Sequence, residues 1–60
     1  MYKVFKEIDL KCRELEQMRI LAQTGEIMYR QKGEVPIADR FKRAESGLGE
    51  AIRMLRAVLV

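Results

Sequence analysis

The sequence predicts an all-α fold, a long antiparallel helical hairpin that dimerises into a four-helix bundle. In each half of the 60-residue chain, apolar side chains recur at alternating spacings of three and four, the repeat of helices packed in a coiled coil. Between the halves lies a short segment with a glycine and the only proline, which marks a break between helices. The first half also carries apolar residues on more sides than one partner helix can cover, which favours self-association.

The first predicted helix covers about residues 2–31. Strong helix formers dominate it, and it contains no proline. The row of side chains expected to face the partner helix, here called the seam, is Phe5, Ile8, Cys12, Leu15, Arg19, Ala22, Glu26 and Tyr29. We interpret Cys12 as a small buried apolar residue. Arg19 and Glu26 interrupt the apolar run, either as solvated ion-pair partners or as a polar device that fixes the pairing of helices.

Gly25 has two interpretations. It is either the left-handed cap of a helix that ends there, or an interior glycine that costs about 1 kcal/mol relative to alanine. We prefer the interior position, because the apolar pattern resumes after Gly25 in the same register. A chain folded at the next break also brings Phe41 opposite Gly25, and a large ring against a missing side chain packs well.

The connection is predicted at residues 32–36. Gly33 suits the position just past the end of the first helix, where a left-handed conformation is common. Pro36 suits the first turn of the second helix and favours an extended conformation for Val35. Such a short connection joins antiparallel neighbours.

The second predicted helix covers about residues 37–59. Its seam is Ile37, Phe41, Ala44, Leu48, Ala51, Leu55 and Val58. Ile52 and Leu59 widen this apolar face. Antiparallel alignment of the two seams gives these pairs: Ile37 with Tyr29, Ala44 with Ala22, Leu48 with Met18, Ala51 with Leu15 and Val58 with Ile8.

Gly47 and Gly49 are unusual inside a helix, because each costs about 1 kcal/mol. They indicate a tolerated bend or local flexibility. Alternatively, Ser46 and Gly49 form a bare surface that a partner's backbone can approach, or the helix breaks here.

Self-association is predicted through exposed apolar residues of the first helix. A rotation of about 100° per residue aligns Leu10, Leu21 and Met28 in a second stripe and puts Ile20 and Ile27 away from the seam. A homodimer of hairpins with two-fold symmetry is the simplest closed arrangement. In length and binary pattern the chain resembles the Rop plasmid copy-number regulators, whose two-helix chains dimerise into a four-helix bundle. This resemblance implies an architecture and assigns no binding residue.

Size and composition exclude several classes of protein. A 60-residue chain makes one domain, 1–60, and is marginally stable alone. It has one cysteine and no histidine, so it lacks an internal disulfide, the commonest metal ligand and the commonest general base. No apolar run approaches a membrane span, and the start lacks the apolar core of a signal peptide. We therefore expect a cytoplasmic, non-enzymatic protein without metal, cofactor or small-molecule substrate.

A partly basic face of the second helix is the candidate binding site. It comprises Lys42, Ser46, Gly49, Arg53 and Arg56. We predict a small regulator or adaptor, of the size that phages and plasmids often encode, that binds another protein. The alternatives are a merely solvated face, nucleic-acid binding by the same basic residues, and a structural or assembly subunit. The net charge is only +3 and no aromatic residue lies among these charges, which favours protein over nucleic acid.

Ion pairs between residues three or four apart are expected along both helices. The predicted pairs are Glu7 with Lys11, Asp9 with Arg13, and Asp39 with Lys42 or Arg43.

Overall fold

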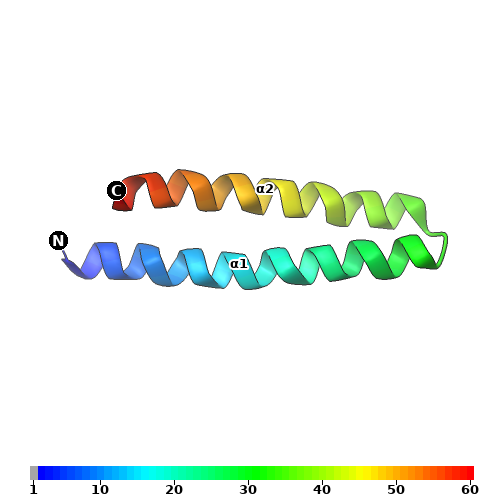
Figure 1. Ribbon diagram of the computed structural model, residues 1–60, viewed down its shortest axis with the longest axis horizontal. Helices are drawn as coiled ribbons and strands as arrows, with labels where there is room; N and C mark the ends of the chain where they lie inside the picture. Colours follow the sequence, from blue (N-terminus) through cyan, green and yellow to red (C-terminus); the bar gives the residue numbers. More distant parts are fainter. Residues whose placement is uncertain (1) are drawn as a thin grey trace.

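The protein is an all-helical antiparallel hairpin, as the sequence predicts. The computed structural model describes residues 2–60, with α1 at Tyr2–Gln31 and α2 at Val35–Leu59. The two helices run side by side along most of the molecule, and the start of α1 extends past the end of α2 (Figure 1). The molecule is a rod with extents of 48 × 14 × 12 Å.

Helix α1 is continuous through Gly25, so the interior interpretation of this glycine is confirmed. The Thr24 hydroxyl donates a hydrogen bond of 3.0 Å to the carbonyl of Ile20, one turn earlier in the same helix. The predicted contact is also present, because a Cβ atom built on Gly25 would lie 2.7 Å from Cε1 of Phe41. The ring of Phe41 stacks on that of Tyr29, with centroids 5.6 Å apart and an interplanar angle of 12°.

Gly33 ends α1 in the predicted left-handed conformation, with φ of 79°. Its N–H donates to the carbonyl of Arg30 at 3.1 Å, and the Glu34 N–H donates to the carbonyl of Tyr29 at 2.9 Å. This pair of bonds is a Schellman motif, which satisfies carbonyls that the helix end leaves without partners.

Helix α2 begins at Val35, two residues before the predicted start, so the expectation of an extended Val35 is wrong. The residue outside the helix is Glu34, with φ of −89° and ψ of 68°. Pro36 still lies in the first turn, where its missing N–H costs no helical hydrogen bond.

The seam predicted for α2 is partly wrong: the side toward α1 keeps Phe41, Leu48 and Leu55 but is turned by about half of the 100° step between residues. The buried residues of α2 are Ala38 and Ile52, whereas Ala44 and Val58 are exposed. The side of α2 toward α1 carries Ala38, Phe41, Glu45, Leu48, Ile52, Leu55 and Leu59. Because Ile52 is larger than its neighbour Ala51, turning it toward α1 removes more apolar surface from water.

Three of the predicted layers are therefore not core layers. Ala44, expected opposite Ala22, is exposed. Met18, expected opposite Leu48, is 51% exposed, and Val58, expected opposite Ile8, is 54% exposed. The seam of α1 agrees better with its prediction, because Cys12 is 1% and Ala22 6% exposed.

The core of the hairpin is thin. Among the residues whose side chains are described, its buried apolar residues are Cys12, Ala22, Ala38 and Ile52, of which Ile52 alone has a large side chain. The accessible surface is 4996 Å², whereas a compact chain of 7.0 kDa exposes about 4000 Å². The hairpin thus exposes about 1000 Å² more than a compact domain of its mass. Neither helix within residues 2–60 has an apolar stretch of the length and hydropathy that crossing a bilayer requires.

Candidate protein-binding surfaces

The five residues predicted to form a binding face all line one open groove between the helices. This groove, here called the charged groove, has a volume of about 600 Å³. Its lining residues are Glu16, Arg19, Lys42, Glu45, Ser46, Gly49, Glu50, Ile52, Arg53 and Arg56. The predicted residues recur every three or four positions, so the helical repeat of α2 puts them on one flank beside α1.

Residues of α1 complete the charged groove and balance its charge. Oε1 of Glu16 lies 3.6 Å from a guanidinium nitrogen of Arg56, and Oε2 of Glu16 lies 3.7 Å from one of Arg19. Sequence reasoning missed Glu16 and Arg19 as groove residues, because the face was derived from the repeat of α2 alone. Four cationic and three anionic side chains therefore line a surface predicted to be mainly basic.

Gly49 forms a bare part of the groove wall. A Cβ atom at this position would lie 3.9 Å from Nε of Arg19, an ordinary van der Waals distance. Packing inside the hairpin therefore does not require a glycine here, unlike at Gly25.

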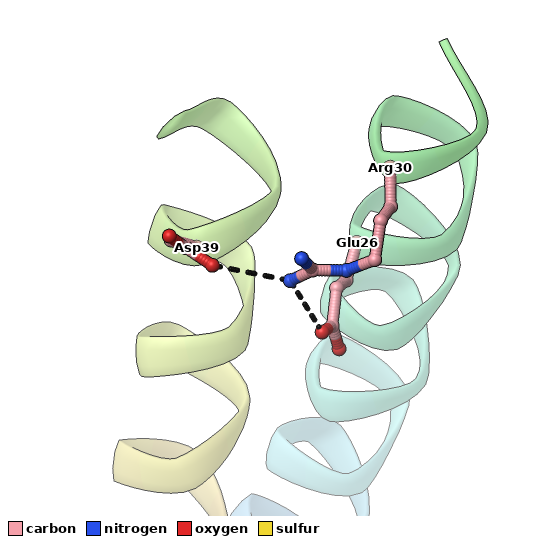
Figure 2. Close-up of polar contacts among 3 residues, drawn as sticks. All are labelled: Glu26, Arg30 and Asp39. Atoms are coloured by element: carbon pink, nitrogen blue, oxygen red, sulfur yellow. Dashed lines mark hydrogen bonds and ion pairs between the residues drawn. The ribbon is translucent and has the colours of Figure 1, made fainter. Parts of the chain in front are cut away.

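A second polar cluster joins the helices near the turn. One guanidinium nitrogen of Arg30 donates hydrogen bonds to Glu26 at 3.0 Å and to Asp39 at 3.1 Å (Figure 2). The hydrogen bond to Asp39 and then that to Glu26 raise the pKa of Arg30 above its ordinary value. Asp39 thus pairs across the hairpin with Arg30 and not with Lys42 or Arg43 of its own helix.

The remaining ion pairs agree in part with the predicted ones. Asp9 and Arg13 pair at 3.0 Å, as predicted. Lys11 pairs with Glu14 at 3.1 Å instead of Glu7. Glu26 and Arg19 do not pair with each other. Glu26 pairs with Arg30, and Arg19 pairs with Glu16.

Every residue predicted to mediate self-association is exposed. Leu10, Ile20, Leu21, Ile27 and Met28 have exposed fractions between 48% and 69%. Because α1 turns by about 100° per residue, Ile20 and Ile27 lie on the flank that also carries Glu16 and Arg30. This flank borders the charged groove, so these two isoleucines lie outside the groove but on its side of the hairpin.

The opposite side of the hairpin is mostly apolar. The same rotation places Val4, Met18 and Leu21 of α1 beside Ala44, Ala51 and Val58 of α2. These six residues are called the apolar side. All are exposed except Ala51, which is half-buried. A second hollow of about 590 Å³ opens here, lined by Val4, Glu7, Ile8, Leu10, Lys11, Glu14 and Leu55.

Among residues 2–60, no group of three or more Cys, Asp or Glu side chains is arranged to hold a metal ion, and Cys12 is a buried free thiol. Comparisons of the chain with models of protein families, with curated proteins and with solved structures found no match.

Proposed function

We propose that this is a small, non-enzymatic regulatory or adaptor protein that acts in the cytoplasm by binding proteins, and that it dimerises into a four-helix bundle. The observation that carries this proposal is the exposure of 48–69% at all five predicted self-association residues of α1. Complete burial of such side chains contributes about 1.5–3 kcal/mol each. Covering the exposed half of several of them supplies a driving force that the thin core of one hairpin lacks.

The mixed charge of the charged groove supports a protein as the second partner. Carboxylates of Glu16, Glu45 and Glu50 line the same groove as the basic residues, and a nucleic-acid backbone would meet them with repulsion. A protein surface can offer both signs of charge. Ile20 and Ile27 beside the groove add the apolar contact that protein interfaces use and phosphate backbones do not.

Light scattering tests the self-association. We expect a molar mass of twice 7.0 kDa at micromolar concentrations. A monomer that keeps its helical circular dichroism over the same range would refute the proposal. Larger assemblies would favour a structural subunit instead of a dimeric adaptor.

Cross-linking tests the role of the charged groove in binding another protein. Arg53→Glu changes the groove, and Arg40→Glu makes the same charge change at an exposed residue of α2 outside it. Partners that the wild type and Arg40→Glu capture, but Arg53→Glu does not, would support the groove as the binding site. Equal capture by all three proteins would contradict it.

A salt titration with DNA and RNA distinguishes the nucleic-acid alternative. Nucleic-acid binding through Lys42, Arg53 and Arg56 requires an affinity that falls steeply with salt concentration. We expect no such binding at low salt.

A further inference from the structure

We propose that the second copy of the chain covers the apolar side of the hairpin and leaves both charged grooves open on the outside of the dimer. This inference rests on the proposed self-association and assigns it to the side that carries Leu21. Of the predicted self-association residues, Ile20 and Ile27 lie on the groove side and therefore outside the contact. The partner is a second copy of this chain, and the contact is isologous, with the same residues on both copies.

Helix α2 carries two overlapping seams of mainly apolar residues, and only one of them faces α1. Phe41, Leu48 and Leu55 belong to both. The seam toward α1 adds Ala38, Glu45, Ile52 and Leu59, whereas the other adds Ile37, Ala44, Ala51 and Val58. In the second set Ala44 and Val58 are exposed and Ile37 and Ala51 half-buried. A face that is apolar over two adjacent seams packs against two helices, and α1 is only one of them.

The apolar side is complementary to itself in the size of its side chains. Its α1 half carries the large side chains of Met18 and Leu21, and its α2 half carries the small Ala44 and Ala51. A two-fold rotation that lays α1 of each copy on α2 of the other brings large residues against small ones. Layers of this kind interdigitate without voids.

The excess exposed surface of the hairpin also matches the area of one such interface. The hairpin exposes about 1000 Å² more than a compact chain of its mass, and a stable interface buries about 800 Å² on each partner. One interface on the apolar side therefore accounts for most of the excess. The opposite side is less suited to a second copy, because two ion pairs cross it from helix to helix, Glu16 with Arg56 and Arg30 with Asp39. The pair of Lys11 with Glu14 beside the apolar side lies within α1 and does not cross between the helices.

Matched glutamate substitutions test the assignment by molar mass. Ala44→Glu and Met18→Glu put a charge on the apolar side. Ala57→Glu and Ile20→Glu make the same changes at exposed positions of α2 and α1 away from it. We expect the first pair to halve the molar mass and the second pair to remain dimeric. A dimer that tolerates both Ala44→Glu and Met18→Glu overturns the inference.

The wild-type chain supplies a readout that does not depend on whether a variant folds. Met18 is 51% exposed in the hairpin, so its thioether is open to oxidation by peroxide. We expect the oxidation of Met18 to slow by about tenfold as the protein concentration rises through the dimerisation range. A wild-type monomer refutes this inference together with the proposed self-association. A dimer in which Met18 oxidises at the monomer rate, or which Ile20→Glu alone dissociates, overturns only the assignment to the apolar side.

Discussion

The ring of Phe41 occupies the space that a side chain at Gly25 would need. A Cβ atom on Gly25 would approach three ring atoms of Phe41 to between 2.7 and 2.9 Å, closer than real Cβ contacts. The ring cannot simply move aside, because it stacks on Tyr29. This contact joins the middle of α1 to the first half of α2 and makes the glycine a packing requirement.

Gly25→Ala should therefore destabilise the protein although alanine is the better helix former. Overpacking of this kind costs about 1–3 kcal/mol, and the gain in helix propensity offsets about 1 kcal/mol of it. We expect a net loss of up to about 2 kcal/mol in the free energy of unfolding, measured by urea denaturation followed by circular dichroism. A variant as stable as the wild type would show that the helices separate easily at this point.

Gly49→Ala is the matched control and should have the opposite sign. The new methyl group would lie 3.9 Å from Arg19, without a clash. Removing the backbone freedom of glycine from a helix interior then stabilises the protein by about 0.5–1 kcal/mol. The same urea experiment measures the change, and a loss of stability would contradict the open space beside Gly49.

Ile52→Ala should be among the most destabilising substitutions in α2. Ile52 is 3% exposed, and truncating a buried isoleucine to alanine costs about 2–5 kcal/mol. Ile20→Ala is the matched control, because Ile20 is 57% exposed and lies away from the apolar side, so it should lose less than about 1 kcal/mol. Equal effects in thermal denaturation would mean that the seam of α2 is not the one described above.

Arg30→Gln should lower the thermal midpoint at low salt, because it removes the bonds to Glu26 and Asp39. These groups are exposed, so the difference in thermal midpoint from the wild type should shrink as salt screens the ion pairs.

The pH dependence of this contribution follows from the raised pKa of Arg30, which means that the folded state holds the Arg30 proton more tightly than the unfolded state does. The contribution of the Arg30 proton to stability is then complete below the ordinary pKa of arginine and is lost only above the folded-state pKa. We expect it to be constant between about pH 7 and pH 10, as melts of both proteins at each pH would show.

The sequence predicts the local features of this fold better than the rotation of α2. Gly33 and the Gly25–Phe41 contact follow from local chemistry and from folding the chain at one break, and both are present. The seam of α2 does not follow in the same way. A pattern identifies which residues are apolar, but Ala51 and Ile52 are both apolar, and the pattern does not choose which of them faces α1.

The residues of the candidate site were predictable from the sequence only in part, for the same reason. The helical repeat brings Lys42, Ser46, Gly49, Arg53 and Arg56 together, and all of them line one groove. The contributions of Glu16 and Arg19 depend on how the two helices are rotated about their axes. Only the assembled hairpin fixes that rotation, so these residues could not be found from one helix at a time.

The buried sulfur of Cys12 provides a natural reporter of how often the two helices part. Cys12 is 1% exposed and is the only cysteine in the chain. A thiol reagent can therefore label the protein only during an opening of the hairpin, and the labelling rate measures the frequency of that motion in the unmodified molecule.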